Sequence, residues 1–265
     1  MFRRSFICSC FVLSAVLATI SPAENCRLSD RGEDHLWSNP ANWEYGKIPT
    51  SNDTFLSTPY YAQRVDWSLY ELVIDDGIDA ICKNAKNMNQ LLMTITGGSL
   101  TVLNEWKISQ DNGIGVQIDM SGGEVEVGNY VDLGGWSSGG SCGTLNMTEG
   151  FFSVGGQLKM GTWGTTSSYL NLHGGIVTAR TLSIGPGPTH IDITEGKLVL
   201  SYNVAGQIGN FVNHGIITGY GGEGEVVYDY DVSMPGKTTI TAVPEPGSLL
   251  LFAAGLCLTR RRRRG

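Results

Sequence analysis

Two tryptophans occupy matching places in the sequence and could stack against sugar rings. Trp136 and Trp163 each lie three residues after an apolar residue, Leu133 or Met160, inside a loop rich in Gly, Ser and Thr. Indole rings present broad apolar faces and are enriched where proteins recognise partners. On neighbouring units of a repeat the pair predicts a carbohydrate-binding platform. The alternative is that each indole folds back over its own loop.

Polar residues, three of them charged, recur at another matching position. This set is Lys107, Asp132, Lys159 and Ser183. On adjacent strands, opposite charges stabilise a sheet by roughly 0.2–1 kcal/mol per pair. The functional alternative is a polysaccharide lyase, in which a lysine abstracts a proton beside Ca²⁺-binding acids. That chemistry needs clustered carboxylates and a base with a perturbed pKa, whereas the acids here are spread out. We therefore expect no catalytic residues and a protein that is not an enzyme.

A third set has side chains that could bind a cation. Its members are Thr94, Asp119, Asn146, Asn171 and Asp192. Amide side chains stacked at strand spacing hydrogen-bond along a column, whereas Ca²⁺ needs several oxygens converging at about 2.3–2.6 Å. The four histidines lack HxH or HExxH spacing, and the cysteines lack CxxC spacing. We predict a structural column with no metal or cofactor, Ca²⁺ being the one ion left open.

These residues are organised by a repeat. The frame Leu145-Asn146-Met147-Thr148-Glu149-Gly150 recurs, and its second apolar position falls at residues 95, 120, 147, 172 and 193. The intervals are therefore 25, 27, 25 and 21 residues, with weaker copies at Leu72–Gly77 and Phe211–Ile216. A period of this size indicates an array of stacked units.

Each unit combines short strands with glycine corners. Apolar and polar residues alternate with a period of two in segments such as 145–147, 152–154 and 158–160, which favours strands over helices. We predict an all-β fold: a parallel β-helix or β-solenoid of about seven coils of 21–27 residues, with no helical segment in the array. An antiparallel sandwich is the rival. The predicted inward columns are Ile95, Met120, Met147, Leu172, Ile193 and Ile108, Leu133, Met160, Ile184, Ile208.

The ends of such an array need covering, because stacked repeats expose their cores at both ends. Residues 24–70 contain Trp37 and Trp43 and are predicted to form an aromatic N-terminal cap. Residues 71–219 form the solenoid, and the acidic, aromatic residues 220–243 form a C-terminal cap or linker. Cys26, Cys82 and Cys142 allow one disulfide, whose pairing stays open.

The N-terminus carries an export signal. Residues 1–23 have an arginine pair, an apolar stretch and small residues before a predicted cleavage site at Ala23, as in secretory signal peptides. Between residues 24 and 243 there are 11 basic and 24 acidic residues, a net charge of −13. Nucleic acid is therefore not an expected partner, because phosphate binding requires a basic face.

The C-terminus has three consecutive parts. Pro244, Glu245 and Pro246 precede an apolar run at 248–258, predicted as a short membrane-spanning helix. An arginine cluster follows: Arg260, Arg261, Arg262, Arg263 and Arg264. This order resembles the PEP-CTERM sorting signal of Gram-negative-type bacteria, over residues 244–265. Positive charges retain such an end on the cytoplasmic side.

The resemblance implies processing near the Pro-Glu-Pro by an exosortase-type membrane enzyme. It also implies a transient stay in the inner membrane before delivery to the cell surface or extracellular matrix. Two hypotheses follow for the exported protein. The first is a structural surface or matrix protein, and the second is a carbohydrate-binding module for an extracellular polysaccharide.

Overall fold

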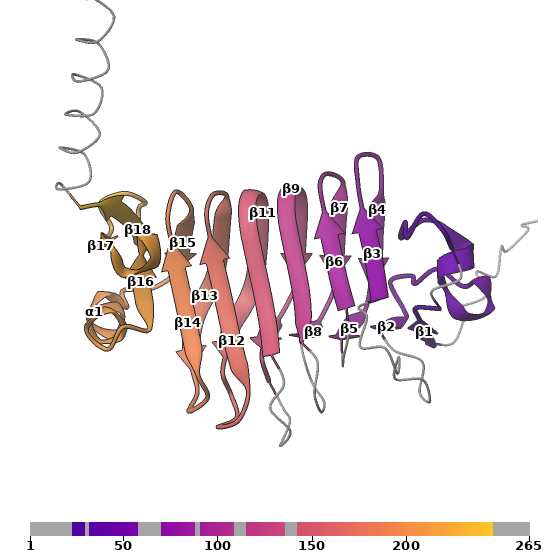
Figure 1. Ribbon diagram of the computed structural model, residues 1–265, viewed down its shortest axis with the longest axis horizontal. Coiled ribbons are helices and arrows are strands. Elements are labelled where there is room, and N and C mark those ends of the chain that lie inside the picture. Colours follow the sequence, from indigo (N-terminus) through magenta and orange to yellow (C-terminus); the bar gives the residue numbers. More distant parts are fainter. Residues whose placement is uncertain are drawn as a thin grey trace, which may run out of the picture.

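The chain forms an elongated β-solenoid in the computed structural model (Figure 1). The structure describes residues 23–29, 32–57, 70–87, 91–108, 115–135 and 142–245. Their strands stack side by side into about seven turns, and each turn contributes to three faces. The predicted all-β solenoid is thereby confirmed.

The first face stacks one strand from each turn. Its strands are β3 (Tyr70–Ile74), β6 (Leu91–Ile95), the first part of β9 (Val116–Val127), the first part of β11 (Cys142–Met160), β12 (Ser167–Leu172), β14 (Thr189–Ile193) and β16 (Ile217–Gly219). Every pairing within this face is parallel. Parallel stacking excludes the antiparallel sandwich for this part of the chain.

The other two faces are built in the same way. The second comprises β4 (Asp79–Cys82), β7 (Ser99–Val102), the end of β9, the middle of β11, the first half of β13 (Ile176–Ile184) and β15 (Lys197–Leu200). The third comprises β1 (Asn25–Arg27), β2 (Thr54–Leu56), β5 (Asn84–Asn87), β8 (Glu105–Ile108), β10 (Tyr130–Leu133) and the ends of β11 and β13. These pairings are also parallel.

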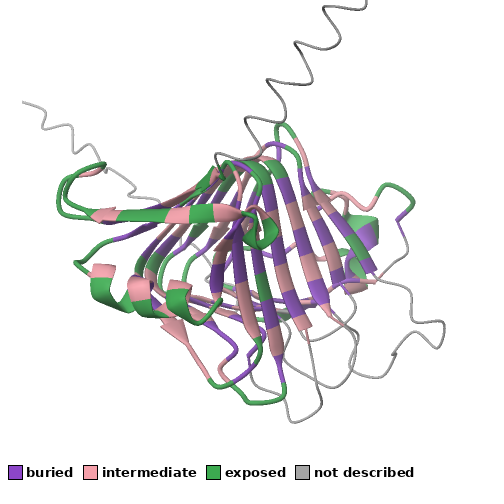
Figure 2. Cartoon of the chain, turned by 60° about the vertical axis from the view of Figure 1, so that its left-hand side comes forward, coloured by how far each residue is buried: buried purple, intermediate pink, exposed green. Residues whose placement is uncertain are grey.

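Apolar side chains from the three faces meet inside the coil. The first predicted column is confirmed, because Ile95, Met120, Met147, Leu172 and Ile193 are in register and buried. Figure 2 shows the period-two pattern as alternating buried and less buried bands along the strands. Full burial of such side chains stabilises a fold by about 1.5–3 kcal/mol each.

Glycines turn the corner between the first and second faces. Gly98, Gly123, Gly150 and Gly175 occupy the same place in successive turns and all have positive φ. At Gly123, with φ of 72°, an added Cβ would also lie 2.4 Å from the carbonyl oxygen of Gly97 on the neighbouring turn. Only glycine satisfies both the backbone conformation and the close approach.

The last turn departs from the predicted strand pattern. The segment after β15 forms the helix α1 (Ala205–Asn213), so the assignments of Ile208 to a strand column and of Phe211–Ile216 to a repeat copy are wrong. Ile208 is still buried, and Phe211 and Val212 pack partly against the core. Their i, i+3, i+4 spacing is that of one helix face.

A helix suits this place for a physical reason. The Gln207 side chain donates to the Leu182 carbonyl oxygen at 3.4 Å, so α1 stacks where a third-face strand would otherwise follow β13. A further strand would leave its outer backbone groups unpaired, whereas a helix satisfies its own. Ile184, the neighbouring member of the predicted column, is only partly buried.

An antiparallel hairpin follows α1 and β16. β17 (Gly224–Tyr230) pairs with β18 (Thr238–Pro244), and β18 pairs in turn with β15 on the second face. The short helix η3 (Tyr220–Gly222) leads into the hairpin. The exposed edge of β15 is thereby covered, although the domain boundaries assigned to this region stay a prediction.

Aromatic side chains pack together at the N-terminal end. The rings of Trp37, Trp43 and Phe55 are arranged edge to face with centroids 4.9–5.5 Å apart. The Trp43 indole Nε1 donates to the Trp37 carbonyl oxygen at 2.8 Å. All three rings are buried, so they belong to the core. The 3₁₀ turns η1 (Pro40–Asn42) and η2 (Glu44–Gly46) flank Trp43, and the role of the region as a cap stays a prediction.

Candidate functional site

The polar ladder on the first face comprises Asp119, Asn146 and Asn171 on successive turns, and the predicted register is confirmed. The Asn171 amide donates to Asn146, and the Asn146 amide donates to Asp119, both at 2.7 Å. Gln117 also donates to both carboxylate oxygens of Asp119, at 2.8 and 3.0 Å. Across these three turns, each ladder amide therefore donates to an oxygen of the preceding turn.

Asp192 continues this column beyond Asn171. Its buried carboxylate accepts from the Thr218 hydroxyl and the Gly221 amide, both at 2.8 Å. Asp119 and Asp192 are separated by two amide rungs, so their oxygens do not converge. In the part of the chain that the structure describes, no cluster of three or more His, Cys, Asp or Glu could hold a metal ion. Ca²⁺ binding stays untested.

The charged column on the third face also has the predicted register. Asp132 lies beside Lys107 on one side and Lys159 on the other. Burial raises the pKa of Asp132 above its usual value, although the Thr162 hydroxyl, which donates at 3.1 Å, and the two lysine charges act in the opposite direction. The fold therefore stabilises this carboxylate less than water does.

Tyr130 connects this column to a neighbouring acid. Its hydroxyl donates to Glu105, and the Lys159 ammonium lies 4.1 Å from its ring centroid. Glu105 also lies 3.7 Å from Lys107 and 3.8 Å from Lys86. Burial and the bond to Glu105 raise the pKa of the Tyr130 hydroxyl. The neutral Tyr130 hydroxyl and the lysines near Glu105 therefore form one polar network on the third face.

The tryptophan platform is described only in part. Trp163 lies in the 161–166 loop between the third and first faces, and 49% of its surface is exposed. Its carbonyl oxygen accepts from the Thr166 amide and hydroxyl, at 3.1 and 2.9 Å, which closes the loop. Trp136 lies outside the described residues, so the pairing of the two indoles stays a prediction.

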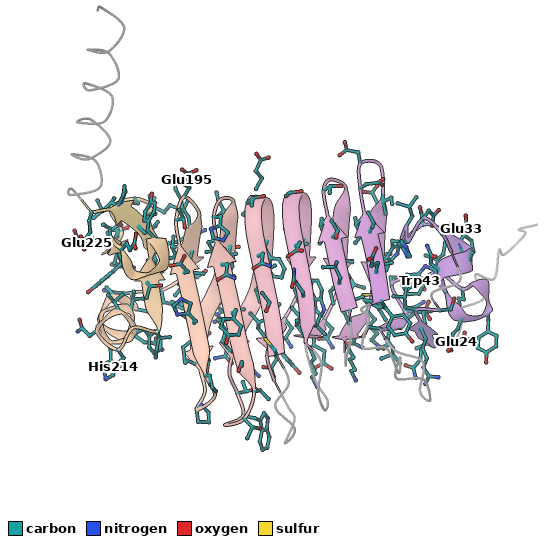
Figure 3. All side chains as sticks on the ribbon, viewed as in Figure 1. Glu24, Glu33, Trp43, Glu195, His214 and Glu225 are labelled. Atoms are coloured by element: carbon teal, nitrogen blue, oxygen red, sulfur yellow. The ribbon has the colours of Figure 1, made fainter. Side chains whose placement is uncertain are left out.

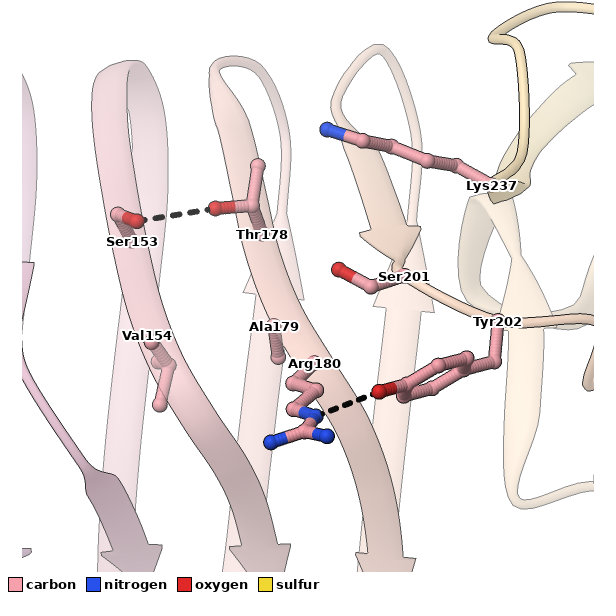
Figure 4. Close-up of a pocket in the computed structure, with 9 residues that line it drawn as sticks. Ser153, Val154, Thr178, Ala179, Arg180, Ser201, Tyr202 and Lys237 are labelled. Atoms are coloured by element: carbon pink, nitrogen blue, oxygen red, sulfur yellow. Dashed lines mark hydrogen bonds between the residues drawn. The ribbon is translucent and has the colours of Figure 1, made fainter.

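A pocket that the sequence did not suggest lies at the corner between the second and third faces (Figure 4). We call it the corner pocket, and its volume is about 470 Å³. It is lined by Ser153, Val154, Gly155, Thr178, Ala179, Arg180, Ser201, Tyr202 and Lys237. The Arg180 Nε donates to the Tyr202 hydroxyl at 2.7 Å, and the Thr178 hydroxyl donates to Ser153 at 3.2 Å.

Part of this pocket follows from the repeat. Ser153 and Thr178 are in register on β11 and β13, so equivalent places in the repeat bring them together. Lys237 comes from the turn before β18, outside the repeat, and nothing in the period places it there. In the sequence, Arg180 lies at a corner where the preceding turn has Gly155. This cation at a glycine position was the signal that could have indicated a binding site.

The C-terminal end leads directly out of the fold. β18 ends at Pro244, Glu245 is exposed, and Figure 3 shows Glu225 on the same hairpin at this end of the rod. Pro246, the apolar run and Arg260–Arg264 lie outside the described residues, as does the predicted signal peptide apart from Ala23. Among the described residues, no helix has the length and apolar character needed to cross a membrane.

Fold and terminus together define a class: a parallel β-solenoid that continues into a C-terminal sorting segment. Residues 242–264 match the PEP-CTERM protein-sorting motif, so the chain carries this motif. Searches of curated proteins and of solved structures find no match to the chain. The motif implies processing by an exosortase-type membrane enzyme, with export and transient membrane anchoring in a Gram-negative bacterium.

Proposed function

We propose that the chain is a non-enzymatic structural protein of the cell surface or extracellular matrix, delivered by the exosortase-type pathway. The polar ladder carries this proposal, because the side chains of Asp119, Asn146 and Asn171 form hydrogen bonds to one another. A column used in this way stiffens a rod and leaves few groups for chemistry. The last strand of the rod also runs directly into the sorting motif. This arrangement suits a protein whose whole solenoid is exported with the motif.

The test follows the full-length protein in exosortase-containing cells and in an exosortase deletion. We expect processing and retention with the envelope or matrix only when both the enzyme and residues 243–265 are present. A Glu126→Gln variant alters an exposed side chain of the solenoid and should be sorted like the wild type. Unchanged processing after deletion of residues 243–265 contradicts the sorting part. A matrix of undiminished cohesion in a strain lacking the protein contradicts the structural part.

A carbohydrate-binding module is the second candidate, and the exposed indole of Trp163 favours it. Trp136→Ala combined with Trp163→Ala should abolish binding on a glycan array. The matched control is Tyr169→Ala, which removes an exposed aromatic ring from β12 outside the loop. Array binding that survives the double variant removes the tryptophan platform from consideration.

A further inference from the structure

The corner pocket contains cations that the protein does not neutralise. Neither Arg180 nor Lys237 forms an ion pair with any carboxylate in the described ranges, although acids outnumber bases in this chain. Asp231, close in sequence to Lys237, is engaged by the Gly236 amide at 2.6 Å. Other described cations do pair with acids, such as Lys47 with Asp53 at 3.1 Å. The residues that line the pocket therefore carry positive charge only, on an acidic body.

Arg180 is held in a fixed orientation. Its Nε is bonded to the Tyr202 hydroxyl, and the centre of its guanidinium lies 5.5 Å from the Tyr202 ring centroid. Figure 4 shows the two terminal nitrogens directed away from that bond, and no described residue accepts a hydrogen bond from them. A guanidinium presented in this way matches the two oxygens of a carboxylate.

The remaining lining suits a hydroxyl-rich ligand. Ser153 and Thr178 form a short row of hydroxyls on adjacent turns, and Ser201 adds another on the next. Tyr202 is 45% exposed and offers part of an aromatic face. A volume of about 470 Å³ lies within the range of roughly 300–1,000 Å³ for small-ligand sites.

We propose that the corner pocket binds a uronate unit of an acidic extracellular polysaccharide, with the Arg180 guanidinium holding its carboxylate and Lys237, at the opposite end of the pocket (Figure 4), adding positive charge that attracts the acidic chain. The hydroxyl row would then bind the sugar hydroxyls, and Tyr202 would keep the guanidinium oriented. This deepens the proposed function, since it rests on export and would attach the rod to the matrix. Carboxylate, polyol and aromatic contacts together distinguish a uronate from a simple inorganic anion.

The experiment measures binding by calorimetry with the purified exported protein at low ionic strength. The probes are oligogalacturonate and oligoalginate, compared with neutral oligosaccharides of equal length and with acetate and sulfate. We expect binding to a uronate oligomer, at least tenfold tighter than to any other probe. Arg180→Gln should weaken it at least tenfold, and Lys237→Gln and Tyr202→Phe about threefold each. Added salt should weaken binding because the contact is charge-dependent.

Lys197→Gln is the matched control, because it removes one exposed positive charge from β15 without touching the pocket. It should leave binding unchanged, and circular dichroism melting should show all four variants folded. The proposal is overturned if no uronate oligomer binds, if sulfate or neutral sugars bind equally well, or if Arg180→Gln has no effect. It is also overturned if only the tryptophan double variant abolishes binding. Binding is measured with purified protein, whereas sorting is measured in cells. A failure to bind uronate therefore does not contradict the proposed sorting, and a failure of sorting does not contradict uronate binding.

Discussion

The polar ladder and the corner pocket both use polar residues on the outside of stacked turns, yet they treat them in opposite ways. In the ladder, each amide donor meets an oxygen on the next turn, as Asn171 does with Asn146 at 2.7 Å. In the pocket, Arg180 and Lys237 supply positive donors that pair with no carboxylate among the described residues. The ladder lies where the repeat is regular, whereas the pocket forms where the hairpin interrupts it. Interruptions of the repeat are therefore where binding chemistry is to be sought.

The first prediction concerns Asp53, a buried carboxylate whose hydrogen bonds are all made within the protein, as they are in the ladder. Its side chain is 1% exposed. Its carboxylate accepts from the Glu24 amide, the Lys47 ammonium, and the amide and hydroxyl of Thr50, at 2.6–3.1 Å. Asp53→Asn places an amide donor against existing donors and should destabilise the protein by about 3 kcal/mol at pH 7. Urea unfolding of the purified protein measures this.

The pH dependence of the same variant follows from the pKa of Asp53. Burial alone would raise this pKa, but the hydrogen bonds from Thr50, Lys47 and Glu24 lower it overall. A lowered folded-state pKa stabilises the protein above the unfolded value of about 3.9, and this is lost as the pH falls through the folded value. The difference between variant and wild type should shrink below pH 4. Asp76→Asn, at an exposed position, is the control, and an equal loss there contradicts the interpretation.

The ladder could be predicted from the sequence and the pocket could not, for a physical reason. A strand period of two and a coil period near 25 residues together determine the register, so Asn146 and Asn171 could be paired in advance. Arg180 and Lys237 line one pocket because β18 pairs antiparallel with β15, which no period encodes. Helix α1 was missed because Ile208 also fitted a strand column, although Phe211 and Val212 completed a helical spacing.

The second prediction breaks the ladder in its middle. Asn146→Leu removes the bond to Asp119 and the acceptor for Asn171. Asp119 keeps its bonds from Gln117, so we expect a moderate loss of about 1–2 kcal/mol in the free energy of unfolding. Glu126→Leu, an equally apolar change at an exposed position, should cost under about 0.5 kcal/mol. Equal losses in the two variants would show that the hydrogen bonds of the ladder contribute no more to stability than an exposed polar side chain does.

The third prediction has the opposite sign and the smallest size. Asp132 is a partly satisfied carboxylate, because burial raises its pKa despite the bond from Thr162 and the charges of Lys159 and Lys107. A raised folded-state pKa means that the stability contributed by the protonated acid is complete below about pH 3.9 and is lost as the pH rises through the folded value. Asp132→Asn prevents this loss of stability, because the amide stays neutral at every pH.

The variant should therefore be more stable than the wild type at pH 7 by on the order of 1 kcal/mol, and the difference should vanish below pH 4. Urea unfolding across pH 3–8 measures it, with Asp76→Asn again as the exposed control. A less stable variant at pH 7 would show that the two lysines fully compensate the buried charge. Asp132 would then belong with the self-satisfied polar ladder. A more stable variant places it with the corner pocket, as a charge that the fold tolerates without satisfying.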